Sequence, residues 1–558
     1  MSIFNLPNTT RRVVVPTEFD RILDMPKTPP LGPPGAAAYW SERLGTGTGV
    51  ALRTPQGGAL DAIHKYRSAF CSITVGGGKA LIALLAGEVC GAKRPLILCP
   101  PALVPLMHAE AEKWEPHFKF TTPEIVSYGI LSTQKDLLER LRPDLIIADE
   151  AHCLRNLNTS RTSRVGEYID HLNPSAGFVA LSGTITNKSL LDHAHLLWWC
   201  LRDRTPIPSR RSYQDLHRWA ACLDPDGEPT RADRISMIPL VRFAGSFEAV
   251  PTRRTIRDAY RRRLVSTPGV IATTETSCNA SLYLIRHEPP PTPTIKRAID
   301  LLEKEWVLPD GEPVADASLH SRARQQVALG FYYRWEWGSA GEDLEWLNLR
   351  RRRNRLIAKV IRGGRVKQAD SPRLVEQWSL AGGGSRELRE TLIEWREIEH
   401  RARPQTVAVW LDRSRFDYLD VFLAQQTAPT LVWYRSKAVE AELEARGFIV
   451  HGPGSKPPTG GTCAASIGVH GKGQNLQMYA NAFIIEPPGG AGVWEQLIGR
   501  HHRSRFDFDA LHIDYFSFDA FRRMKKARGE ADYIEETQGS KQKLNLASFL
   551  KTGFNPTK

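Results

Sequence analysis

The 558 residues are 41% hydrophobic and carry a formal net charge of +14, so the chain is long enough for several globular domains of about 150 residues, and its charge favours a polyanionic partner. No apolar run approaches the roughly 18 residues that cross a bilayer, and no charged start precedes an apolar segment at the N-terminus. These absences exclude a membrane span and an export signal and predict a cytoplasmic protein, and the eight scattered cysteines without a Cys-x-x-Cys pair indicate reduced thiols rather than a zinc site.

The first segment, residues 1–48, is rich in proline and ends in alternating glycines. This composition predicts an extended lead-in rather than a domain.

A phosphate-binding loop is indicated after the expected strand 70–74. Gly76, Gly77 and Gly78 can turn backbone N–H groups towards an anion, Lys79 can reach terminal phosphates, and the helix expected over 80–89 adds its N-terminal partial charge. The pattern Gly-x-x-x-x-Gly-Lys-Ser/Thr is incomplete, because Ile73 replaces its first glycine and Ala80 replaces the hydroxyl that binds Mg²⁺. A glycine turn next to a chance lysine therefore remains an alternative.

Strands and helices then alternate, which predicts a parallel sheet over residues 49–201. The expected strands are 95–100, 125–128, 144–148 and 177–181, and the expected helices are 103–114, 130–141 and 190–201. Asp149 and Glu150 follow a buried apolar run, at the carboxyl end of a strand where parallel sheets bind ligands. Alone, the acidic pair is equally consistent with a cap of the next helix.

Residues 202–400 show many arginines, several tryptophans and little strand signal, which predicts a mainly helical basic insertion. The run Arg350, Arg351, Arg352 and Arg353 is a candidate for phosphate contact with nucleic acid. The aromatic stretch 331–337 is read as the core of a small helical unit or as a platform for base stacking.

A second alternating series predicts another lobe over residues 401–527, with strands at 406–411, 430–434, 448–450 and 482–486. In the helix expected from about 493, Gln496, Arg500 and Arg503 share one face at i, i+4 and i+7. Residues 528–558 are polar and basic, which predicts a mobile tail.

In this order the segments resemble superfamily 2 helicases, and most closely the Swi2/Snf2-like translocases with a DEAH box, in a compact bacteriophage-type form. Gln56 resembles the adenine-contacting glutamine of that family, Gly76 to Lys79 its phosphate loop, and Asp149-Glu150-Ala151-His152 its DEAH box. The other matching segments are Leu98 to Pro101, Ser182-Gly183-Thr184, Gly471-Lys472-Gly473-Gln474-Asn475-Leu476-Gln477 and Gln496 to Arg503. The sequence departs from the family at Ala80, at Ile185 where many relatives have proline, and at Ser504-Arg505 where Gly-Gln is common.

The resemblance implies an α/β fold of two RecA-like lobes, ATP and Mg²⁺ as cofactors, and hydrolysis of ATP between the lobes to move along or remodel DNA. Catalysis would use Lys79, Asp149 as the metal-orienting carboxylate, Glu150 as base, and Arg500 and Arg503 from the second lobe. The nucleotide would also contact Gln56, Ala80, Gly473, Gln496 and the loop glycines, while His152, Ser182, Gly183 and Thr184 would couple hydrolysis to nucleic acid.

Two alternatives stay open: a nucleotide- and nucleic-acid-binding module that has lost hydrolysis, which Ala80 suggests, and a motor subunit of a nuclease complex. DNA is the expected partner, with RNA as the alternative and with replication or recombination proteins as further partners, in a bacterial or phage-infected cytoplasm.

Overall fold

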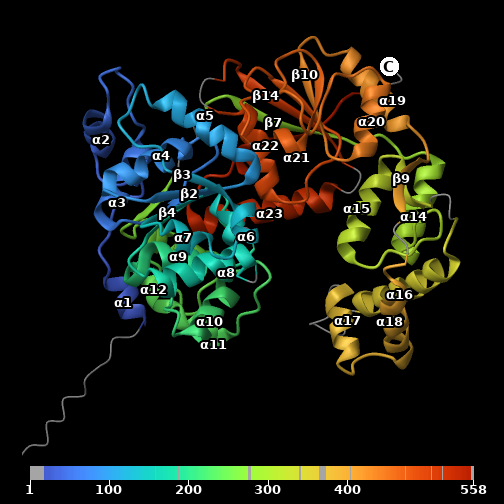
Figure 1. Ribbon diagram of the computed structural model, residues 1–558, viewed down its shortest axis with the longest axis horizontal. Helices are drawn as coiled ribbons and strands as arrows, with labels where there is room; N and C mark the ends of the chain where they lie inside the picture. Colours follow the sequence, from blue (N-terminus) through green and yellow to red (C-terminus); the bar gives the residue numbers. More distant parts are fainter. Residues whose placement is uncertain are drawn as a thin grey trace, which may run out of the picture.

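The computed structural model describes residues 18–157, 159–186, 188–273, 278–337, 341–363, 372–401, 404–471, 473–503, 506–517 and 520–554. Two parallel sheets form two RecA-like lobes, with a mainly helical unit attached to the second (Figure 1). The predicted fold class is confirmed. Among these residues no helix combines the length and apolar content needed to cross a bilayer.

The first lobe has a six-stranded sheet with the order β3-β2-β4-β5-β1-β6, and all its pairs are parallel. Its strands are β1 (Ala69–Ser72), β2 (Pro95–Cys99), β3 (Glu124–Ser127), β4 (Leu145–Asp149), β5 (Gly177–Ser182) and β6 (Val270–Ala272). Its main helices are α3 (Thr54–Tyr66), α4 (Lys79–Cys90), α5 (Val104–Trp114), α6 (Tyr128–Thr133), α7 (Leu137–Leu141), α8 (Ser160–Glu167) and α9 (Ala194–Leu201). The central strands are buried on both faces, as expected for apolar runs in a sheet that helices cover on two sides.

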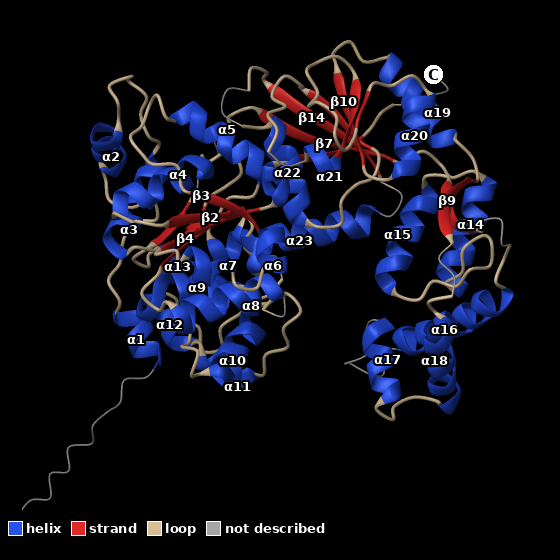
Figure 2. Cartoon of the chain, viewed as in Figure 1, coloured by secondary structure: helices blue, strands red, loops and turns tan. Residues whose placement is uncertain are grey.

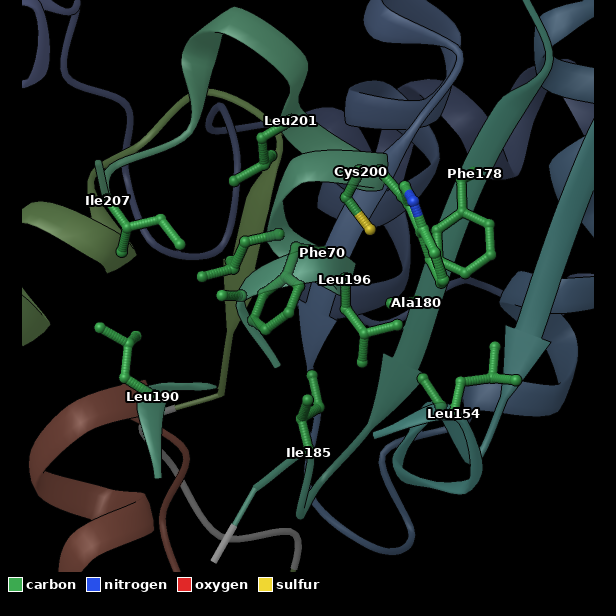
Figure 3. Close-up of a cluster of buried hydrophobic side chains, with 14 of the residues drawn as sticks. Phe70, Leu154, Phe178, Ala180, Ile185, Leu190, Leu196, Cys200, Leu201 and Ile207 are labelled. Atoms are coloured by element: carbon green, nitrogen blue, oxygen red, sulfur yellow. The ribbon is translucent and has the colours of Figure 1, made fainter. Parts of the chain in front are cut away.

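Successive residues of β4 feed two cores, because side chains alternate across a strand. Leu145 and Ile147 pack with α3 and α4, whereas Ile146 and Ala148 pack on the opposite face. Figure 3 shows that second core, where Phe70 and Phe178 from the strands meet Leu196 and Cys200 from α9. Ile185 is fully buried in the same cluster and fills the core there.

The predicted domain limits differ from the structure around this lobe. The lead-in contains α1 (Glu18–Asp24) and α2 (Ala36–Leu44), and α2 buries Trp40 against the first lobe; residues 1–17 lie outside the described part. The start of the predicted insertion also belongs to this lobe and contains α10 (Tyr213–Leu223), α11 (Arg231–Ser236), α12 (Ile238–Phe243) and α13 (Arg253–Val265). Of these, α10, α12 and α13 share the core of the lobe through Trp219, Leu240 and Tyr260, whereas α11 buries no side chain. Sequence periodicity could identify these helices but not the surface that they cover.

The second lobe has a seven-stranded sheet with the order β11-β12-β10-β13-β14-β7-β15. Its strands are β7 (Ser281–His287), β10 (Thr430–Tyr434), β11 (Val450–His451), β12 (Cys463–Ser466), β13 (Asn481–Ile484), β14 (Ala510–Phe516) and β15 (Ser548–Lys551). Its helices are α19 (Ser414–Ala424), α20 (Lys437–Ala445), α21 (Ile467–His470), α22 (Ala491–His501), α23 (Ala520–Gln538) and α24 (Lys543–Leu546).

The helical unit contains α14 (Pro293–Glu305), α15 (Ala317–Ala328), α16 (Leu344–Gly363), α17 (Pro372–Leu380) and α18 (Arg386–Ile398) (Figure 2). The aromatic stretch forms the strand β8 (Phe331–Glu336), which pairs antiparallel with β9 (Gln405–Trp410). The strand expected to open the second lobe therefore lies outside its seven-stranded sheet. The predicted mobile tail instead forms the end of α23, α24 and the edge strand β15.

Candidate nucleotide site between the two lobes

The predicted phosphate loop joins β1 to α4, and two of its glycines have a backbone that other residues rarely adopt. Gly76 has φ +87° and Gly78 has φ +79°. A Cβ on Gly78 would lie 2.2 Å from Nε2 of Gln56, and one on Gly77 would lie 2.4 Å from Cγ2 of Ile73. Ile73, which replaces the first glycine of the pattern, is fully buried and supports the loop next to Gly77.

Two side chains hold this loop without a ligand. Gln56 donates from Nε2 to the Gly78 carbonyl (3.2 Å) and accepts at Oε1 from the Arg53 amide (2.8 Å). The Lys79 ammonium donates to the carbonyls of Ile73 (3.2 Å) and Thr74 (3.4 Å). The ammonium therefore rests on the end of β1, at the start of the turn.

A cavity of about 270 Å³ lies over the loop, and both lobes line it. The lining residues that the sequence predicted are Gln56, Gly76, Gly78, Lys79, Ala80, Asp149, Glu150, Gly473, Arg500 and Arg503. The structure therefore brings together residues that are more than 400 positions apart in the chain.

Asp149 and Glu150 reach the cavity because β4 ends in a sharp turn. Asp149 closes the strand, and Glu150 has φ +52°, a left-handed backbone that costs a residue with a side chain on the order of 1 to 3 kcal/mol. The Tyr128 hydroxyl donates to the Asp149 carbonyl (2.9 Å) and fixes the end of the strand. The pair is thus a wall of the cavity, and the helix-cap alternative does not describe it, since neither side chain caps a helix here.

The two carboxyl groups have opposite electrostatic surroundings. Burial, followed by the charge of Glu150, raises the pKa of Asp149. Burial also opposes ionisation of Glu150, but the hydrogen bond from His152 and the charges of Lys79, His152 and Arg500 hold its pKa well below the usual range. Glu150 is therefore the ionised member of the pair, and a cation beside Asp149 would favour ionisation of that carboxyl as well.

A hydrogen-bonded chain links Glu150 to the residues expected to couple hydrolysis to nucleic acid. His152 Nδ1 lies 3.2 Å from Glu150 Oε2 and 3.3 Å from Ser182 Oγ. Ser182 Oγ donates to Glu150 Oε2 (3.5 Å) and accepts from the Thr184 amide (3.2 Å). Burial opposes protonation of His152, yet hydrogen bonds with Cys153 and Glu150 raise its pKa to about 9.

Arg500 projects from α22 of the second lobe towards these carboxylates. It is 9% exposed, and its Nε is buried without a hydrogen-bond partner in the described structure. Burial and the charge of Arg503 lower its pKa to about 10, whereas Glu150 and Asp149 oppose that shift. A buried guanidinium with an unmatched donor is costly unless a ligand completes its hydrogen bonds.

Two glycines of the second lobe lie close to side chains of the first lobe. A Cβ on Gly499 would lie 2.5 Å from Cγ1 of Val75 in the phosphate loop, and one on Gly473 would lie 2.0 Å from Cδ1 of Leu106 in α5. Only glycine allows these approaches without movement of the neighbours. The glycine before Arg500 thus lets α22 rest on the loop.

The predicted face of α22 is only partly observed. Gln496 is buried one turn before Arg500 and does not line the cavity, and Arg503 lies beyond the helix, which ends at His501. Arg503 donates to Asn475 Oδ1, and burial lowers its pKa while Glu110 opposes the shift. Ser504 and Arg505, and Lys472 of the other motif, lie outside the described residues.

The arginine run on α16 faces carboxylates of its own helical unit. Arg350 and Arg351 pair with Glu312, Arg353 pairs with Glu376, and Arg352 lies 3.6 Å from Glu387 and 3.9 Å from Glu394. Arg352 has the most exposed side chain of the four, at 47%. Phosphate contact by this run stays a prediction, and the ion pairs give the run a structural role that the sequence did not reveal.

Several residues of the site were missed in the sequence. Arg53, which donates to the Gly76 carbonyl (3.0 Å), lies one turn before Gln56, and this spacing could have indicated it. Leu103, just before α5, and Leu106, Met107 and Glu110 of α5 also line the cavity, and no local pattern distinguishes them from an ordinary amphipathic helix.

Comparison with known proteins adds no identification to this geometry. No protein-family model matches the chain, and no curated protein matches it. The assignment of function therefore depends on the residues of the site themselves.

Proposed function

We propose that this chain is a nucleic-acid-stimulated ATPase that acts as a translocase or helicase of the Swi2/Snf2-like type. The observation that carries the proposal is Arg500, a buried cation with an unmatched donor that faces Glu150 across a cavity over the phosphate loop. Arginines that arrive from a second lobe stabilise transition-state charge in nucleotide hydrolases and contribute about 10³ to 10⁵ in rate.

The residues of the first lobe suit the anchoring of a triphosphate. The loop glycines allow backbone N–H groups to point towards an anion at the N-terminus of α4. Lys79 can exchange its two carbonyl partners for phosphate oxygens. Gln56 and Arg53 border the same cavity on the side of α3, where the base would lie.

Glu150 suits the role of general base. It is held ionised by His152 and nearby cations, so it can orient an attacking water molecule and accept its proton. The chain from Glu150 through Ser182 to the Thr184 backbone would report the state of the site to bound nucleic acid.

The residues present fit Mg²⁺ with few protein ligands. The Asp149 carboxylate borders the cavity beside Lys79, and Ala80 offers no hydroxyl. Mg²⁺ usually keeps several water ligands, so one carboxylate and the substrate phosphates can hold it, where it would neutralise phosphate charge.

Phosphate release should be measured with no nucleic acid, single-stranded DNA, duplex DNA and RNA. We expect stimulation by at least one polymer and its loss in Lys79→Ala and Glu150→Gln. Wild-type rates in both variants would contradict the proposal, and the preferred polymer identifies the partner.

Ala80 favours a second candidate, a nucleotide-binding module that does not hydrolyse ATP. That candidate predicts saturable ATP binding that Lys79→Ala abolishes, with no phosphate release by the wild type under any of the four conditions.

A further inference from the structure

The helix α23 contacts all three parts of the molecule, and Figure 1 shows it between the two sheets beside α22. Near its start, Arg523 donates to the Gln325 side chain of the helical unit (2.7 Å). In its middle, Glu530 accepts from the Ala491 amide at the start of α22 (2.9 Å). Near its end, Tyr533 donates to Asp224 of the first lobe (2.9 Å).

After α23 the chain turns back between the lobes. Gly539 has φ +70°, and a Cβ there would lie 2.6 Å from Cγ1 of Val265 in α13. The following Lys541 amide donates to the Thr273 carbonyl (3.1 Å). The Oγ1 of Thr273 in turn accepts from the Thr74 amide of the phosphate loop (3.0 Å).

The next residue, Gln542, contacts the Ser182-Gly183-Thr184 motif, which is expected to couple hydrolysis to nucleic acid. The fully enclosed Gln542 side chain donates from Nε2 to the Gly183 carbonyl (3.3 Å). A Cβ on Gly183 would lie 2.9 Å from the carbonyl oxygen of Ile73, so this motif is pressed against the start of the loop. Gln542 is therefore connected to the loop through Gly183.

Glu495 of α22 binds the same segment from the second lobe. Its carboxylate is 3% exposed and accepts from the amides of Lys543 (2.9 Å) and Leu544 (2.7 Å). Glu495 lies five positions before Arg500 in α22. Lys543 and Leu544 are the first residues of α24, so the Glu495 carboxylate accepts hydrogen bonds from backbone N–H groups that have no partner within that short helix.

We infer that Glu495 and Gln542 are positioning residues, and that residues 539–547 form a clamp that holds α22 against the Ser182-Gly183-Thr184 motif and so fixes Arg500 opposite Glu150. The catalytic part of this inference rests on the proposed ATPase function. Neither residue lines the cavity, so the clamp would act by positioning Arg500 and not by contacting the nucleotide.

The clamp contains groups that favour its release. Oγ of Ser540 and Oε1 of Gln542 are buried without a hydrogen-bond partner in the described structure, as are both polar atoms of the Gln538 amide just before the clamp. Each such group costs free energy that exposure to water would return.

The test uses the full-length chain with Glu495→Gln, Gln542→Ala and, as a matched control, Glu444→Gln on the exposed side of α20. Two quantities are measured: kcat and KM for ATP with the stimulating nucleic acid, and amide hydrogen exchange of residues 491–501 and 539–547. We expect each clamp variant to lose about tenfold in kcat while KM changes by less than about threefold, since the loss of one buried hydrogen bond has about this order of effect. Exchange should accelerate in both segments, and the control should match the wild type in both measurements.

Wild-type kcat in both clamp variants, or a change confined to KM, would overturn the inference while leaving the ATPase proposal intact. If the wild type itself releases no phosphate, the ATPase proposal fails, and unchanged exchange in both variants would then overturn the clamp separately. A clamp variant that does not fold is replaced by Glu495→Asp or Gln542→Asn, each of which keeps the polar group but shortens its reach to its partner, and which is subject to the same criteria.

Discussion

Glu150 and His152 form the contact that determines the charge of the site. Burial lowers the pKa of His152, but hydrogen bonds with Cys153 and Glu150 outweigh that effect and raise the folded-state pKa from the ordinary 6.5 to about 9. Its stabilising contribution is therefore complete below about pH 6.5 and is lost as the pH rises through about 9.

This linkage can be tested with His152→Gln by urea unfolding between pH 6 and pH 10. We expect the wild type to exceed the variant in unfolding free energy at pH 6 and to lose that advantage by pH 10. A difference that stays constant across this range would show that His152 is not a protonated partner of Glu150.

Ala80 is the residue at which the site departs most from its pattern. Ala80→Thr places a hydroxyl in the first turn of α4, at a position that borders the cavity. We expect the Mg²⁺ concentration for half-maximal ATPase activity to fall several-fold, because a further oxygen ligand becomes available. Ala80→Val adds similar bulk without the hydroxyl, and an equal effect of both variants would refute the ligand explanation.

A site residue can be predicted from the sequence when the contacts that position it come from residues nearby in the chain. Lys79, Asp149 and Glu150 could be predicted, because a strand followed by a turn places them locally. Glu495 and Gln542 could not, because their partners lie on other elements and no spacing in the chain encodes those contacts.

At the scale of elements, the approach of α22 to the phosphate loop depends on Gly499. Gly499→Ala should raise intrinsic helix stability by up to about 1 kcal/mol, yet its Cβ would meet Val75 at 2.5 Å. The two effects oppose each other in stability, whereas the steric effect alone moves α22 relative to the phosphate loop, so we expect ATPase activity to fall while the melting temperature changes little. Gly529→Ala on α23, where a Cβ meets no atom within 4 Å, is the matched control and should retain full activity.

The helix α16 allows its structural and nucleic-acid roles to be separated. Arg350→Gln leaves the largely buried Glu312 with one arginine partner and should destabilise the helical unit. Arg352→Gln removes the most exposed of the four arginines in the run and should reduce the slope of log binding constant against log salt by about 1 if that side chain contacts phosphate. An unchanged slope in Arg352→Gln would remove this run from the nucleic-acid surface.

At the scale of the whole molecule, the two lobes could be predicted and their complete sheets could not. Alternating apolar strands and amphipathic helices identify each lobe, because both patterns are local. The strands β7 and β15 join the second sheet from segments far apart in sequence, and β9 leaves it to pair with β8. Parallel pairing leaves no turn signal between partners, so the sequence does not specify which strands become neighbours.

The central claim is that one ATPase site is divided between two lobes, and Arg500 tests it most directly. Single-turnover ATP hydrolysis should be compared in the wild type, Arg500→Ala and the distant control Arg396→Ala, each in excess over ATP at a concentration that binds all of it, and each saturated with the stimulating nucleic acid. We predict that Arg500→Ala slows hydrolysis by about 10³-fold or more while ATP still binds, since the arginine acts on transition-state charge. Hydrolysis by Arg500→Ala at the wild-type rate would contradict the divided site.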